Sequence, residues 1–185
     1  EVLNTGTNCL QEYHYLVKKV VFEVEMLPVI KLISCFIVHV CFLVIMIGLY
    51  LISGYMPMIT WLQILYYSFA ASMLGLALTF FTSAVQVFFK DMAQIVGICL
   101  QFGMWLTPIM YDEKIFTDRA PWLGTVFKLN PFYYIAAGYR DSMMTGNWFF
   151  ERPTMTLYFW AVTLILMLIG LKMFKKLRPH FSDVL

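Results

Sequence analysis

The feature that most constrains this chain is a series of long apolar runs separated by short charged turns. The run FFKDMAQIVGICLQFGMWLTPIMY (88–111) carries Lys90 and Asp91 near its start, then has no charged side chain as far as Tyr111. An α-helix rises about 1.5 Å per residue, so about twenty such residues cross a hydrocarbon core roughly 30 Å thick. The pattern predicts a membrane-embedded helix.

Composition supports the same class of protein. Hydrophobic residues make up 61% of the sequence and charged residues 13%, whereas about a quarter of the residues in ordinary soluble domains are charged. The formal net charge of +2 is too small to favour a nucleic-acid partner, and we expect none. The partners expected from composition alone are membrane lipids.

We expect an all-α fold, a polytopic membrane helical bundle with four full transmembrane helices and short re-entrant external helices. The expected crossings are residues 29–52, 61–89, 92–110 and 154–171. We interpret residues 1–185 as one transmembrane domain, the C-terminal part of a longer protein whose N-terminal crossings are missing, because the sequence opens on Glu1 without a signal-peptide pattern. Residues 1–11 would be the last turns of an earlier helix running out into water, and residues 12–31 an amphipathic segment at the membrane surface.

Lysine and arginine positions predict the orientation of the bundle. Basic residues cluster at alternate ends of the four crossings, whereas residues 53–60 contain none. The positive-inside rule places those basic ends in the cytoplasm and the long 112–153 connection outside. The residues that carry this inference are Lys18, Lys19, Lys31, Lys90, Lys172, Lys175, Lys176 and Arg178.

The 112–153 connection contains signals for two short helices. Residues 120–127 form a short apolar segment, and Asn130-Pro131 is a strong helix start, with Asn as N-cap and Pro at the first helical position. Gly146 supplies a stop. Trp148, Phe149 and Phe150 then form an aromatic belt of the kind found at membrane interfaces.

Polar residues within the crossings have structural and functional interpretations. In the second crossing, small residues recur at spacings of three and four, which favours a face for close helix packing: Ser68, Ser72, Gly75, Thr79 and Thr82 or Ser83. For His39 we favour a neutral imidazole bonded within the bundle over a proton or substrate role.

In the third crossing, Gln94 and Gln101 lie on one side and need partners in hydrocarbon. Helix packing and the lining of a translocation path explain these glutamines equally well. With Trp105, they are our candidate path residues.

No catalytic or metal-binding pattern is recognisable. His14, His39 and His180 are isolated, and the four cysteines have no paired spacing, which indicates small core residues. The sequence contains no GxxxxGK[ST] phosphate loop, so we expect no cofactor in this chain and an energy source in a partner or an ion gradient. We therefore expect a protein that is not an enzyme.

Several segments together resemble a known family. LVKKVVFEVEMLP (16–28), FFKDMAQIVGICLQFGMWLTPIMYDE (88–113), LNPFYYIAAGYRD (129–141) and FKKLRPHFSDVL (174–185) resemble, in order and spacing, membrane subunits of ATP-binding-cassette exporters of the type-two permease class. Within that class the similarity is to exporters of O-antigen, capsule and teichoic acid chains. One departure is Glu23, where the family usually has proline.

The resemblance implies a permease subunit of the bacterial inner membrane that moves a lipid-linked polysaccharide or teichoic acid outward. It would pair with a second copy of itself and with two cytoplasmic ATPase subunits, which would bind ATP and Mg²⁺. The implied ATPase-coupling segment comprises Tyr13, Leu16, Val17, Lys18, Lys19, Val20 and Phe22. The implied external gate comprises Trp122, Asn130, Pro131, Tyr133, Tyr134, Tyr139 and Arg140.

Two other functional classes stay open from the sequence. One is an exporter of the same fold that moves drugs, lipids or ions. The other is a membrane-embedded transferase or assembly protein without a transport role, which the lack of a catalytic pattern disfavours. Aromatic residues near the external loop suit sugar rings, but they also collect at any membrane interface.

Overall fold

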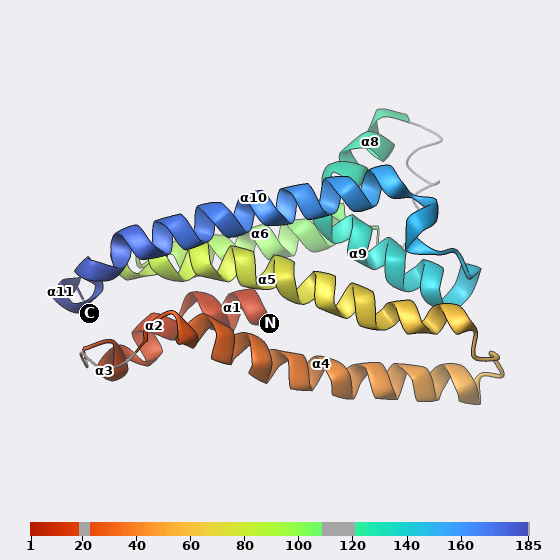
Figure 1. Ribbon diagram of the computed structural model, residues 1–185, viewed down its shortest axis with the longest axis horizontal. Helices are drawn as coiled ribbons and strands as arrows, with labels where there is room; N and C mark the ends of the chain where they lie inside the picture. The colour runs from red at the N-terminus through yellow and green to blue at the C-terminus, as the bar shows by residue number, and fades with distance from the viewer. Residues whose placement is uncertain (19–22, 109–120, 185) are drawn as a thin grey trace. The chain divides into compact units, whose positions relative to one another are not determined.

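The computed structural model describes residues 1–18, 23–108 and 121–184, and every regular element in these ranges is a helix (Figure 1). The chain forms two compact units. Unit 1 contains Glu1–Met56, Ser72–Gly97 and Thr163–Leu185, and unit 2 contains Pro57–Ala71 and Ile98–Val162. The helices α5 (Gln63–Phe88), α6 (Met92–Leu106) and α10 (Pro153–Leu177) contribute residues to each unit.

Unit 1 is built around an apolar core. Its remaining elements are α1 (Val2–Thr7), α2 (Cys9–Glu12), α3 (His14–Val17), α4 (Met26–Ile52), η4 (Arg178–His180) and α11 (Phe181–Val184). Leu10, Phe174 and Phe181 are fully buried in the core, and the Phe174 ring packs edge to face against the rings of Phe80 and Phe181. Short helices from the two ends of the chain therefore share one core with α5 and α10.

The first residues of the chain pack inside unit 1. Gly6 lies so close to the side chain of Thr79 that an added methyl group would collide with it. The Thr7 hydroxyl donates to Thr82 Oγ1 at 2.9 Å. The expectation that residues 1–11 run out into water is therefore wrong, and the packing face expected on α5 is confirmed at Thr79 and Thr82. Small side chains permit this close approach of helices.

The surface segment expected over residues 12–31 is also different in the structure. Within its described part, α2 ends at Glu12, the four-residue α3 follows, and α4 begins at Met26. Pro28 lies in the first turn of α4, as expected, where a missing backbone N–H breaks no helical hydrogen bond.

Unit 2 combines the start of α5 and the end of α6 with the connection before α10. Its other elements are η1 (Ile59–Leu62), α8 (Pro121–Leu129), α9 (Pro131–Arg140), a π-helical turn (Asp141–Thr145) and η3 (Phe149–Glu151). The two short helices expected in the 112–153 connection are confirmed as α8 and α9. The Asn130 side chain accepts a hydrogen bond from the Phe132 N–H at 3.0 Å, so Asn130 caps α9 as predicted. Gly146 ends the π-turn with a φ of 74°, a conformation that glycine adopts without strain.

Three helical segments in the described ranges are long and apolar enough to cross a membrane: Met26–Ile52, Ile59–Phe88 and Pro153–His180. The four full crossings expected from the sequence are not confirmed. The helix α6 has 15 residues, or about 22 Å of length, less than the roughly 30 Å of hydrocarbon. It ends at Leu106 because proline disfavours a helical conformation at the preceding residue, here Thr107.

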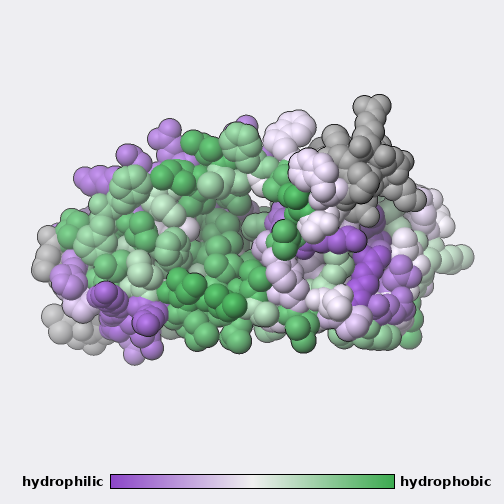
Figure 2. All heavy atoms as spheres, turned by 90° about the horizontal axis from the view of Figure 1, so that it is seen from above, coloured by the Kyte–Doolittle hydropathy of each residue, from purple (hydrophilic) through white to green (hydrophobic). Residues whose placement is uncertain are grey.

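Large apolar side chains are exposed on the chain. Green, hydrophobic residues cover much of the face seen in Figure 2, and α4 exposes apolar side chains along most of its length. A helix that is apolar on all sides is typical of a membrane span.

Candidate functional site

The expected coupling segment is only partly available to a partner. Val17 is buried in the unit 1 core, and Tyr13 and Leu16 pack against that core. Tyr15 is 52% exposed, and His14 and Lys18 are also exposed. Lys19, Val20 and Phe22 lie outside the described residues. The exposed surface that we call the coupling face therefore consists of His14, Tyr15 and Lys18, and Tyr15 was not singled out from the sequence.

The expected path residues form an exposed polar stripe on α6. Gln94, Gln101 and Trp105 are all exposed in the single chain. Their spacings of seven and four residues place them on one side of a helix. Exposed glutamine amides on an otherwise largely apolar helix need water or a partner chain.

Helix α9 binds the end of α6 through two of the expected gate residues. Asn130 Nδ2 donates to Thr107 Oγ1 at 2.8 Å, and Thr107 Oγ1 in turn donates to the Gly103 carbonyl at 2.8 Å. Arg140 donates to the Pro108 carbonyl at 2.7 Å. Pro108 lies two residues beyond the end of α6, so the guanidinium satisfies a backbone carbonyl in the segment that follows the helix.

A chain of hydrogen-bonded aromatic residues joins α5, α9 and α10 within unit 2. Trp160 Nε1 donates to the Tyr66 hydroxyl at 2.8 Å, and the Tyr66 and Tyr134 hydroxyls lie 3.1 Å apart. The Tyr134 hydroxyl lies 3.0 Å from Thr156 Oγ1, which donates to the Phe149 carbonyl. We call these five residues the tyrosine network. Burial raises the pKa of Tyr134, so its hydroxyl stays protonated.

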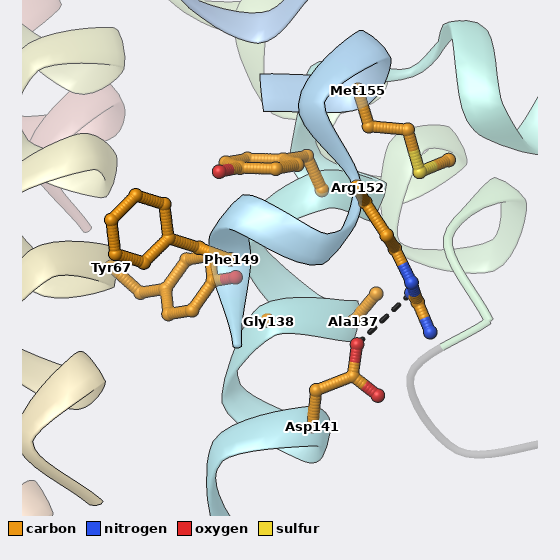
Figure 3. A pocket seen from close by; sticks show the side chains of 8 residues that line it. Tyr67, Ala137, Gly138, Asp141, Phe149, Arg152 and Met155 are labelled. Carbon is orange, nitrogen blue, oxygen red and sulfur yellow. Dashed lines mark ion pairs between the residues drawn. The ribbon is translucent and has the colours of Figure 1, made fainter. Parts of the chain in front are cut away.

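A small pocket lies beside this network (Figure 3). Figure 3 shows Arg152 and Asp141 pointing toward one another across its rim, and Arg152 Nη1 lies 2.9 Å from Asp141 Oδ2. The cavity volume is about 10 Å³, room for about one water molecule. The pocket is thus too small for a sugar ring, and the ion pair ties the start of α10 to the end of α9.

The other expected gate residues have different surroundings. Tyr133 is buried, and the Tyr139 hydroxyl lies 2.8 Å from Ser68 Oγ. Trp122 on α8 is exposed, and Pro131 occupies the first position of α9. Tyr134, Tyr139, Asn130 and Arg140 are therefore brought into unit 2 contacts, whereas Trp122 faces outward.

Two buried glutamines on α5, Gln63 and Gln86, were not predicted as site residues. Gln63 donates to the Asn147 carbonyl at 3.0 Å and accepts from the Phe149 N–H at 2.8 Å. Gln86 makes a comparable set of bonds in unit 1. Like Gln94 and Gln101, these glutamines are amides in an apolar helix and need partners, which is the signal that marks them in the sequence.

No group of three or more His, Cys, Asp or Glu side chains that could hold a metal occurs among the residues that the structure describes. All four cysteines are free thiols; Cys9 and Cys35 are buried, whereas Cys41 and Cys99 are exposed, so only the first two are core residues in this chain. Burial raises the pKa of the Cys9 thiol to about 12, which makes it a poor nucleophile and agrees with the predicted role as a core residue.

Comparison with protein families assigns most of this chain to one family. Residues 3–144 match the family model described as ABC-2 type transporter. The chain belongs to the ABC-2 type transporter family. The match contains α4 and α6, and it also includes the coupling face and α9.

Related proteins point to one branch of this family. The chain is 24% identical over 173 residues to the O-antigen export system permease protein RfbA of Klebsiella pneumoniae, and 23% identical to a second RfbA of that species. It is 25% identical over 182 residues to RfbA of Myxococcus xanthus. These alignments cover 92%, 92% and 96% of this chain and 64%, 64% and 67% of the relatives. The chain thus spans about two thirds of the length of these permeases.

Proposed function

We propose that this chain is part of the permease subunit of an ATP-driven exporter that moves a lipid-linked polysaccharide of the O-antigen type, or a teichoic acid, across the bacterial inner membrane. The observation that carries the proposal is the family match over residues 3–144. The names of the three relatives favour O-antigen as the substrate class. ATP and Mg²⁺ belong to a partner ATPase, and the permease itself catalyses no reaction.

The coupling face is where the ATPase docks. His14, Tyr15 and Lys18 supply an imidazole, a phenol ring and a cation at the surface of unit 1, and aromatic residues are frequent anchors in protein interfaces. The neighbouring Leu16 and Val17 pack on the chain's own core. They hold the segment in position for the partner and leave the contact to the exposed residues.

The exposed stripe of α6 faces the substrate path, which is formed with a second copy of the permease. Glutamine amides donate to and accept from hydroxyl groups, and an indole ring packs on the C–H face of a sugar. Gln94, Gln101 and Trp105 therefore provide chemistry suited to a passing glycan. The basic ends of the helices face the cytoplasm, and α8 and α9 lie on the external side as gate helices.

A deletion of the full-length gene tests the proposal in cells. Intact cells are treated with periodate and a hydrazide fluorophore, which labels vicinal diols of surface polysaccharide whatever the order of its sugars. Deletion is expected to abolish most surface labelling and to leave labelled polymer inside lysed cells. Full-length permease on a plasmid is expected to restore the surface signal and to co-purify an ATPase in detergent.

The control is a full-length permease carrying Tyr15→Ala and Lys18→Glu on the coupling face. We expect this variant to insert in normal amount, because these side chains are exposed, and to recover about ten-fold less ATPase, the loss that corresponds to about 1.4 kcal/mol of binding. Recovery of no ATPase with the wild type would overturn the exporter proposal. An ATPase with unchanged surface polysaccharide after deletion would favour drugs, lipids or ions as the substrate.

A further inference from the structure

Gln86 connects three segments of unit 1 through one buried side chain. Its Nε2 donates to Gln11 Oε1 at 3.2 Å and to the Lys90 carbonyl at 3.0 Å. Its Oε1 accepts from the Ala93 N–H at 2.7 Å. Gln86 is 3% exposed. Both donors and one acceptor site of this amide are therefore used inside the protein.

Backbone groups fix the orientation of the Gln86 amide. The Ala93 N–H requires an acceptor and the Lys90 carbonyl requires a donor, so turning the amide over would place like groups together at both contacts. Gln11 completes the arrangement, because its own Nε2 donates to the backbone carbonyl of Gln86 at 3.3 Å. The two glutamines, 75 residues apart in sequence, thus form a reciprocal pair.

The contact of Gln86 with Gln11 joins α5 to the helix that precedes the coupling face. Gln11 lies in α2, just before Glu12. Lys31 Nζ forms an ion pair with Glu12 Oε2 at 2.6 Å. Cys9 and Leu10 of the same short helix are fully buried. The helix α2 is therefore fixed to the core, to α4 and to α5, and the exposed His14 and Tyr15 follow within four residues of Gln11.

The second contact leads to the helix with the polar stripe. Ala93 is the second residue of α6, and its N–H is one of the groups that a helix start leaves without a partner. The Gln86 side chain, on α5, accepts from this N–H, and Ala93 directly precedes Gln94. A single amide therefore joins the segment that precedes the coupling face to the first turn of the helix that carries the candidate path residues.

We propose that Gln86 is a positioning residue that transmits movement of the ATPase-bound coupling face to α6 during transport. The inference depends on the proposed exporter function. A displacement of α3 moves α2 and with it Gln11. The hydrogen bonds between Gln11 and Gln86 then move the first turn of α6. An ordinary cap would serve α6 alone; the additional donor to Gln11 is what connects the two segments.

Two variants remove hydrogen bonds of this connection, one at Gln11 and one at Gln86. Gln11→Leu removes the reciprocal bonds and leaves the contacts of Gln86 with Lys90 and Ala93. Gln86→Glu keeps an acceptor for the Ala93 N–H but replaces the two donors by carboxylate oxygen. Both are made in the full-length permease with its ATPase. Thr82→Val is the matched control, because it removes a buried hydrogen bond in unit 1 that joins α1 to α5 and involves no residue of α6.

The measured quantity is surface polysaccharide, labelled as above, relative to the ATP hydrolysed by the purified complex in lipid nanodiscs. Coupling between protein sites is typically about 5-fold or more. We expect Gln11→Leu and Gln86→Glu to lower this ratio by at least that factor with normal amounts of complex, and Thr82→Val to leave it unchanged.

An unchanged ratio in Gln11→Leu would overturn the inference and leave the exporter proposal intact. A ratio lowered equally in Thr82→Val would show a general loss of packing and would also overturn it. Absence of ATPase from the wild-type complex is a different result, since it contradicts the proposed function itself.

Discussion

In unit 1, the rings of Phe80, Phe174 and Phe181 pack edge to face in an apolar cluster. In unit 2, the rings of Tyr66 and Tyr134 carry hydroxyls that form one hydrogen-bonded network with Thr156 and Trp160. Dispersion contacts are non-directional but are lost when a gap opens between the atoms, whereas hydrogen bonds weaken steeply with angle. Unit 1 should therefore lose stability mainly when apolar volume is removed, whereas unit 2 should also lose stability when a single hydroxyl is removed.

The largest effect is expected from a cavity in unit 1. Phe181 is fully buried and follows the last membrane-compatible helix, so Phe181→Ala should lower the free energy of unfolding by about 3–5 kcal/mol, as for other buried phenylalanines. Thermal unfolding of the full-length protein in detergent measures this loss. Phe150→Ala is the control in unit 2, since Phe150 is 60% exposed and its loss should change little. Equal destabilisation by the two variants would contradict an apolar core in unit 1.

A smaller loss is expected where unit 2 is closely packed. Gly138 lies against the ring of Tyr67, and an added methyl group would collide with that ring. Gly138→Ala should therefore cost about 1–3 kcal/mol through overpacking. Gly48→Ala in α4 is the matched change, because nothing lies near its added methyl group and alanine favours a helix. Circular dichroism melting curves of the two variants should move in opposite directions, and a parallel shift would show the close contact to be absent.

Removal of one hydroxyl from the tyrosine network tests how much its hydrogen bonds contribute to stability. Tyr134→Phe should lower the free energy of unfolding by about 1 kcal/mol, because Tyr66 keeps its bond from Trp160 and Thr156 keeps its bond to the Phe149 carbonyl. Tyr55→Phe is the control at an exposed ring. Denaturant unfolding in detergent distinguishes the two variants. No difference between them would mean that the network adds nothing to stability.

The smallest effect is expected at the ion pair of the pocket. Arg152 is partly exposed, so Asp141→Asn should cost between about 0 and 1 kcal/mol and less at high salt. Unfolding midpoints at low and high ionic strength measure both the size of this loss and its dependence on salt. A larger loss that does not depend on salt would contradict an exposed ion pair as the role of Asp141.

The sequence was informative about local features. The long apolar runs, the Asn130 cap and the Gly146 stop follow from interactions within a few residues, and the structure contains all three. The length of α6 was overestimated because the apolar run continues past Thr107-Pro108 and proline ends the helix at Leu106.

The missed features depend on partners distant in the sequence. The pairing of Gln11 with Gln86 and of Gln63 with Asn147 joins residues more than 70 positions apart, and nothing in the local pattern indicates which segment meets which. The coupling segment shows the same limit. Leu16 and Val17 were apolar residues without a place in the membrane, and they pack on the chain's own core. The exposed ring of Tyr15 becomes apparent only once that core is known.

The central claim is that the surface around Tyr15 meets an ATPase inside the cell. The direct measurement is photo-cross-linking in living cells with p-benzoylphenylalanine at position 15 of the full-length permease, and at position 55 as the control on the side expected to be external. The account predicts a cross-link from position 15 to a protein that contains a phosphate-loop motif, identified by mass spectrometry, and none from position 55. Cross-links from position 15 only to lipid or to external proteins would contradict it.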